Sequence, residues 1–107
     1  MALYMYQSTY TAESVAALIR EPEDRIEAVR PGLEAAGARI VVGGYPFGEH
    51  KIVLLIEVPD DTTAASLGLV GTSSGAFGQV KITQLLSGQE WVESLRKAQG
   101  SQYQSAR

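Results

Sequence analysis

His50 is the only histidine of this chain and its one side chain with an ordinary pKa near neutral pH, which makes it the candidate for acid-base catalysis. A plain structural alternative stands beside this hypothesis, because a single histidine at the start of a strand is commonly just a hairpin residue. Glu49 does not complete a catalytic pair, since adjacent residues of a strand point to opposite faces. The chain has no cysteine, which excludes thiolate nucleophiles, disulfides and the common structural zinc sites.

A second group of residues suggests ligand binding. Lys51 and Glu57 are separated by an even number of positions, so they share one face of a strand expected over residues 51–58. Tyrosines from an N-terminal strand and a lysine from a late strand could join them. Polar groups in such an apolar setting fit a small-molecule pocket, and equally a partly hydrated subunit interface. The candidate ligand-binding residues are Tyr4, Tyr6, Lys51, Glu57 and Lys81.

The remaining motifs argue against bound cofactors. The Gly-rich stretch from Gly71 to Gly75 is predicted to be a loop, but no Lys-Ser or Lys-Thr pair opens a helix after it, so nucleotide binding is rejected. Asp60 and Asp61 follow Pro59 at an expected helix start, where a carboxylate caps backbone amides without any ion. No nearby histidine or further carboxylate completes a ligand set. We therefore expect no metal and no cofactor.

Composition indicates one ordinary folded domain. The chain has 107 residues, of which 45% are apolar and 20% charged. A net charge of -3 with scattered basic residues argues against nucleic acid and anionic membranes as partners. No segment approaches the roughly 20 apolar residues of a membrane span, and the start lacks a secretory pattern, so we expect a cytoplasmic protein. We expect one domain over residues 1–100 and a disordered tail over 101–107.

Apolar periodicity predicts four strands with helices between them. The strands are expected over residues 2–10, 39–47, 51–58 and 76–86; helices are expected after Thr11, from Glu23 to Gly37, after Pro59 and after Ser87. This βαββαβ order with a closing helix is the ferredoxin-like α+β arrangement: an antiparallel sheet, helices on one face, and the first and third strands central. Trp91 and Leu95, spaced i and i+4, are predicted to anchor the closing helix to the core.

The run from Ile52 to Ile56 is apolar at five successive positions. A strand with one face in water alternates, so this run requires cover on both faces of the sheet. Helices in so short a chain cover one face, and we expect a second copy to cover the other. The predicted assembly is a homodimer with the two sheets face to face, a dimeric α/β barrel. Tyr45 and Phe47 are expected to pack on the partner subunit or to form an aromatic lip over a cavity.

The segment from Tyr45 to Lys51, with the apolar strand and the Val58 to Asp61 stretch after it, resembles the centre of the GYD domain family. The order of elements is similar from Tyr4 to about Ala98. The family is named for a Gly-Tyr-Asp element after the hairpin turn; Gly48 is kept here, whereas His50 and Lys51 stand where tyrosine and aspartate are expected. The resemblance implies a ferredoxin-like domain similar to dimeric α/β-barrel proteins, without an established activity.

Two main functions follow as hypotheses. The first is a non-catalytic, self-associating α/β-barrel protein with room for a small molecule between its sheets. The alternative is a small cofactor-independent enzyme, resembling dimeric α/β-barrel monooxygenases, decarboxylases or isomerases, with its site in the dimer cavity. Its chemistry would be supplied by His50, Tyr4, Tyr6 and Lys81. A third hypothesis is a ligand-sensing module that regulates a separate partner protein.

Overall fold

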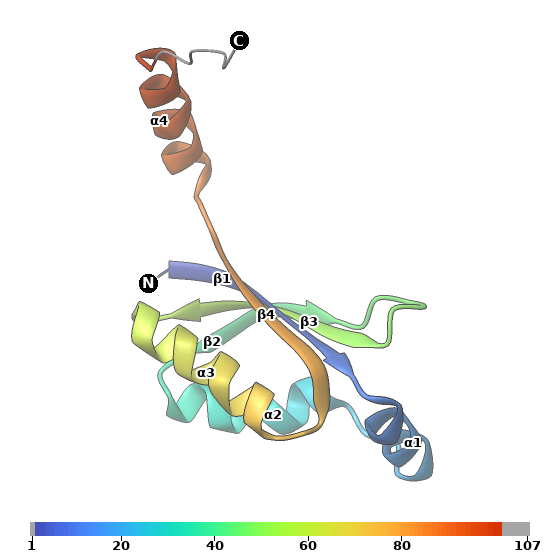
Figure 1. The fold of residues 1–107 in the computed structure, drawn as a ribbon. Helices are drawn as coiled ribbons and strands as arrows, with labels where there is room; N and C mark the ends of the chain where they lie inside the picture. The colour runs from blue at the N-terminus through green and yellow to red at the C-terminus, as the bar shows by residue number, and fades with distance from the viewer. Residues whose placement is uncertain (1, 102–107) are drawn as a thin grey trace.

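The computed structural model describes residues 2–101. Along this range the elements are β1 (Ala2–Tyr10), α1 (Ala12–Arg20), α2 (Arg25–Ala35), β2 (Arg39–Gly44), β3 (Lys51–Val58), α3 (Asp61–Ser73), β4 (Phe77–Leu85) and α4 (Gly88–Gln99). The strands form one antiparallel sheet in the order β2-β3-β1-β4. α2 and α3 lie on the same face of it (Figure 1). The ferredoxin-like α+β architecture with β1 and β3 in the centre is confirmed.

The core lies between the sheet and these helices. On β3 the residues alternate between fully and partly buried, and the fully buried set is Ile52, Leu54, Ile56 and Val58. Residues directly opposite one another on paired strands point to the same face. Tyr4, Tyr6 and Ser8 of β1 are opposite Ile56, Leu54 and Ile52, so they also face the helices. The even-numbered residues of β3 therefore meet the helices.

Each helix begins at a residue whose side chain accepts a hydrogen bond from a backbone amide of the first turn, an arrangement that satisfies one of the otherwise unpaired donors. The capping residues are Thr11, Asp24, Asp60 and Ser87. Ser87 and Glu90 form a capping box, in which each side chain accepts from the backbone amide of the other residue. α2 continues through Pro31, and the chain turns after it at Gly37, whose φ of 84° suits glycine.

β2 is shorter than predicted, ending at Gly44. It is an edge strand, and Pro46 has no amide hydrogen with which to continue the ladder. The register of β2 with β3 shifts between Ile40 and Val42. Gly43 leaves no room for a side chain, since a Cβ there would lie 2.6 Å from Leu54 Cδ2.

The predicted loop from Gly71 to Gly75 is wrong for its first half, because α3 continues to Ser73. Gly71 is buried and faces β1, since a Cβ there would collide with the Tyr6 hydroxyl. Gly75, with a φ of 76°, makes the turn into β4. The small residues that resembled a flexible loop instead allow the end of α3 to lie close to the sheet.

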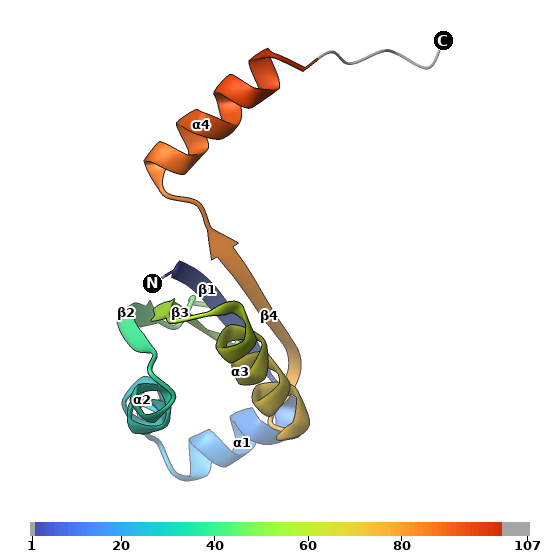
Figure 2. The ribbon, with the colours of Figure 1, turned by 90° about the vertical axis from the view of Figure 1, so that its left-hand side faces the viewer.

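The prediction that Trp91 anchors α4 to the core is also wrong. α4 extends from the end of β4 on the side of the sheet away from α2 and α3 (Figures 1 and 2). Trp91 and Leu95 are 57% and 51% exposed, and no residue of α4 is buried. Helical periodicity identifies an apolar face without saying which surface covers it. The connection through Leu86 and Ser87 carries this face away from the core.

Candidate functional site

The sheet has an open face opposite α2 and α3. Its centre is an apolar strip of four partly buried residues from β1 and β3: Leu3, Met5, Val53 and Leu55. Within residues 2–101 no helix covers this strip, and the views from two sides show both α2 and α3 on the other face (Figures 1 and 2). Val53 and Leu55, the odd-numbered residues of the apolar run of β3, belong to this strip.

The five predicted ligand-binding residues divide between the two faces. Lys51, Glu57 and Lys81 lie on the open face, because they are opposite Thr9, Leu3 and Gln7 of β1. Tyr4 and Tyr6 lie on the helix face. The sequence predicts the parity within each strand, but the register between strands decides which residues share a face. The five residues therefore do not line one common cavity.

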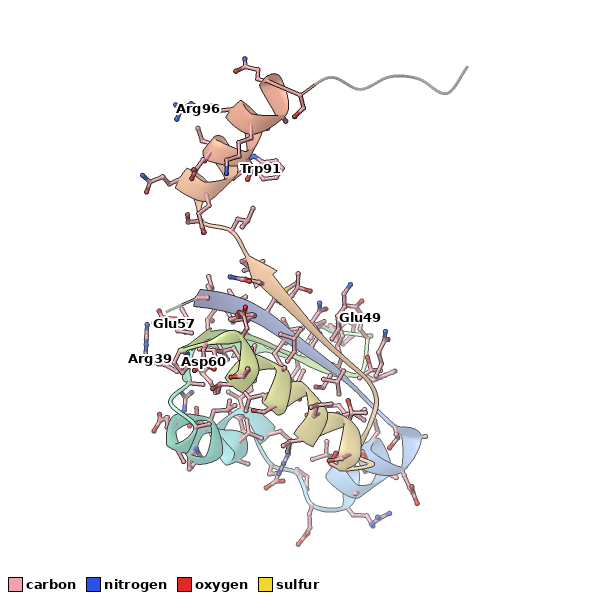
Figure 3. All side chains as sticks on the ribbon, turned by 60° about the vertical axis from the view of Figure 1, so that its left-hand side comes forward. Arg39, Glu49, Glu57, Asp60, Trp91 and Arg96 are labelled. Carbon is pink, nitrogen blue, oxygen red and sulfur yellow. The ribbon has the colours of Figure 1, made fainter. Side chains whose placement is uncertain are left out.

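A shallow polar hollow of about 200 Å³ lies at one end of the open face, lined by Gln7, Thr9, Lys51, Gln79 and Lys81. Lys51 Nζ donates to Gln7 Oε1 at 2.9 Å and lies 3.8 Å from a carboxylate oxygen of Glu49. Glu57 is near the other end of the face, where Arg39 Nη2 donates to its carboxylate at 2.6 Å (Figure 3). Only the two lysines of the predicted set therefore belong to this hollow.

Tyr4 is part of the core and of the start of α3. Its hydroxyl donates a hydrogen bond to the carboxylate of Asp61, and this bond, together with burial, raises the pKa of Tyr4. Asp60 caps the same helix, accepting from the amide of Thr63 at 2.8 Å. Both aspartates thus have roles at the helix start, and within residues 2–101 no three His, Asp or Glu side chains form a group able to hold a metal.

His50 lies exposed in the hairpin between β2 and β3. Its φ is 51°, in the left-handed region, and its carbonyl accepts a hydrogen bond from the amide of Tyr10 at 2.9 Å. The backbone of His50 therefore fixes the hairpin against the end of β1, while its side chain remains on the outside.

Tyr45 has a structural role that the sequence did not suggest. Its hydroxyl donates to Asp24 Oδ1 at 2.7 Å and accepts from the amide of Ile26 at 3.0 Å. The bond to Asp24 lowers the pKa of that carboxyl group, while burial is the main cause that raises the pKa of Tyr45. Phe47, at the tip of the hairpin, is fully exposed.

A larger hollow than the polar one lies on the helix face and was missed from the sequence. It is a groove of about 710 Å³ with a floor from β1 and β3 and walls from α1, α2 and α3. In the sequence, the apolar residues that line the groove look like ordinary core residues. The apolar periodicity of a helix does not show whether that helix packs against its neighbour. The one available signal is the small-residue spacing of α2: Ala28, Gly32 and Ala36 line the groove at i, i+4 and i+8.

Two polar groups near this groove are buried without partners. Among the described residues, Tyr10 Oη and Ser8 Oγ have no hydrogen-bond partner. Both residues belong to the helix face of β1, and Tyr10 lines the groove beside Phe77, their ring centroids 5.3 Å apart. Burial raises the pKa of Tyr10 to about 12, so the hydroxyl is a protonated donor throughout the neutral range.

The fold and these surfaces define a ferredoxin-like α+β domain with one helix-covered and one open sheet face. The sequence model of the GYD domain matches residues 4–95, and the chain belongs to the GYD domain family. A comparison with curated proteins found no match. Each helix within residues 2–101 is too short or too polar to cross a membrane.

Proposed function

We propose that this GYD domain protein is a cytoplasmic, non-catalytic homodimer whose open sheet faces pack against each other as an α/β barrel. The observation that carries the proposal is the apolar strip of Leu3, Met5, Val53 and Leu55 on the two central strands of a sheet whose packed helices, α2 and α3, lie on the other face. Contiguous apolar surface of this kind is typical of a protein interface. A twofold axis would let one strip cover the other.

α4 supports the same arrangement. This helix lies on the same side of the sheet as the strip (Figure 2), and it carries the exposed apolar residues Trp91, Val92 and Leu95. A second copy that approaches the open face therefore also approaches α4. In a twofold dimer each α4 would extend past the sheet of the partner, and its apolar face would be removed from water there.

Light scattering coupled to size exclusion tests the proposal. The wild-type chain is expected to have twice the monomer mass at micromolar concentration, and Leu55→Glu is expected to give a folded monomer, since it places a charge in the strip. Leu69→Glu is the matched control, because Leu69 is 70% exposed on α3, on the other side of the sheet. Circular dichroism verifies that both variants fold. A monomeric wild type would refute the dimer.

The polar hollow favours a second, narrower role within the dimer, binding of a small anion between the sheets. Lys51 and Lys81 both line it, and closure by the partner sheet would strengthen their attraction for an anion by excluding water. Of the groups required by the enzyme alternative, Lys81 faces this space, whereas Tyr4 and Tyr6 face the helices and the His50 side chain is exposed. This distribution favours binding over catalysis. Calorimetric titration with inorganic phosphate, comparing wild type with Lys81→Gln, is the test.

A further inference from the structure

We propose that a free oxyanion with the size and charge of phosphate binds in the polar hollow and strengthens the dimer, with Lys51 and Lys81 as its cationic ligands. This coupling rests on the proposed function, because it needs the two open sheet faces to pack together. It adds that anion binding and dimerisation are linked, so that each raises the affinity of the other by the same factor.

The hollow and the apolar strip form one continuous surface. Val53 of the strip is opposite Gln7 in the pairing of β3 with β1, and Gln7 is opposite Lys81 in the pairing of β1 with β4. The three side chains therefore form one row across neighbouring strands, which lie about 4.8 Å apart in a sheet. Lys51 is two positions from Val53 on the same face of β3. A partner sheet that covers the strip therefore also lies over the hollow.

The open face carries more cations than carboxylates, although the chain as a whole has a net charge of -3. At one end of the face Glu57 is already paired with Arg39. At the other end, Lys51 Nζ lies 3.8 Å from a carboxylate oxygen of Glu49, whose side chain is 60% exposed. In the part of the chain that the structure describes, Lys81 forms no salt bridge.

A second copy does not supply the missing negative charge. In a twofold dimer both subunits use the same surface, so the partner sheet brings the same two lysines and the same paired Glu57. An ammonium group that loses water without gaining a counter-charge opposes association. The dimer interface would therefore contain uncompensated positive charge at each hollow. An anion between the sheets would neutralise it, and the exclusion of water would strengthen the attraction.

The lining of the hollow suits a ligand with several acceptor oxygens. Besides the two lysines it consists of Gln7, Thr9 and Gln79, and it includes no carboxylate. Lys51 Nζ donates to Gln7 Oε1 at 2.9 Å, which leaves the Gln7 amide nitrogen to donate elsewhere. Hydrogen bonds from such donors to an ionised oxygen are stronger than those between neutral groups. A multivalent oxyanion uses this set of donors better than chloride does.

The size of the hollow favours a free anion over the phosphate group of an organic molecule. Its volume is about 200 Å³, below the range of roughly 300–1,000 Å³ typical of sites for organic ligands. The partner sheet would also close it from the open side. The ligand class is therefore a small inorganic oxyanion, for which phosphate is the probe.

Analytical ultracentrifugation of the full chain measures the coupling. Sodium phosphate is expected to lower the dissociation constant of the wild-type dimer at least about fivefold, with saturation, relative to sodium chloride. The two salts are compared at equal ionic strength, which keeps the screening of surface charges constant. Glycerol phosphate should have the smaller effect, because its organic part has no room between the sheets. An equal or larger effect of glycerol phosphate would overturn the free anion as the ligand.

Lys81→Gln separates the charge from any structural role of this residue. In sodium chloride the variant should form a tighter dimer than wild type, because the uncompensated ammonium group is gone. Its response to phosphate should fall below about twofold. Arg20→Gln is the matched control, since it removes the same charge from an exposed position on α1, a helix that borders the groove on the other face. It should keep the full response to phosphate.

The failures of the coupling and of the dimer are distinguishable. A wild-type chain that stays monomeric in both salts would overturn both. A dimer with equal dissociation constants in phosphate and chloride would overturn the coupling alone, and so would a Lys81→Gln variant that responds to phosphate like wild type. Circular dichroism verifies that both variants are folded, so that a change in the dissociation constant reports on the interface.

Discussion

The hydroxyl of Tyr45 donates to the carboxylate of Asp24 at 2.7 Å, joining the β2–β3 hairpin to the start of α2. The same hydroxyl accepts a hydrogen bond from the amide of Ile26 at 3.0 Å. Asp24 Oδ1 accepts from that amide as well, also at 3.0 Å. Tyr45 thus adds to the N-cap of α2 at Asp24, which lies 21 positions earlier in the chain. This contact joins Tyr45 to Asp24, between Glu23 and Arg25 of the groove lining.

Tyr45→Phe should lower the melting temperature by a few degrees at neutral pH, since both hydrogen bonds of the hydroxyl are lost. The contact lowers the pKa of Asp24 in the folded state below its ordinary value of 3.8. Its contribution is therefore present above that value and is lost as the pH falls through the folded pKa. Thermal melts from pH 7 to pH 2.5 should show the two proteins converging in acid. A constant difference throughout would contradict this role of Asp24.

Gly43→Ala should destabilise the domain by about 1–3 kcal/mol, because the added methyl has no room. A Cβ at Gly43 would lie 2.6 Å from Leu54 Cδ2 and 3.1 Å from the backbone oxygen of Val53. Gly44→Ala is the matched control, since a Cβ there would meet nothing within 4 Å. Urea denaturation of both variants measures the difference. Equal stability of the two would show that β2 does not approach β3 as described.

His50→Val should destabilise the domain by about 1–2 kcal/mol, because a β-branched residue is poorly tolerated at positive φ. His50→Gly should cause no comparable loss, since glycine adopts this conformation freely. Chemical denaturation compares the two. If valine and glycine were equally tolerated, the left-handed conformation at this position would be wrong.

Ending the chain after Leu86 should leave the domain folded, because α4 has no buried residue. In the Leu55→Glu background the truncated and full-length chains should melt at similar temperatures. In the wild-type background the truncation should raise the dissociation constant of the dimer, measured by analytical ultracentrifugation, since the partner would lose the cover of Trp91 and Leu95. An unchanged dissociation constant would show that α4 does not contribute to the dimer.

Local patterns predicted much of the fold. The strand predicted over residues 51–58 has the bounds of β3, and α4 begins after Ser87 as predicted, because strand parity and helix caps depend on residues a few positions apart. The order of the elements then placed β1 and β3 in the centre of the sheet. The buried run of β3 agreed with that position.

Relations between distant segments were decided by the tertiary structure. Register against β3 turned Tyr4 and Tyr6 toward the helices while Lys51 and Lys81 faced the other way, since a shift of one residue exchanges the faces. After Leu86 the chain leads away from the core. Trp91 therefore lies outside the core, although its i, i+4 spacing with Leu95 predicted a place in it. The groove exists because α2 and α3 stand apart over the sheet, and a separation between helices is not encoded in the periodicity of either one.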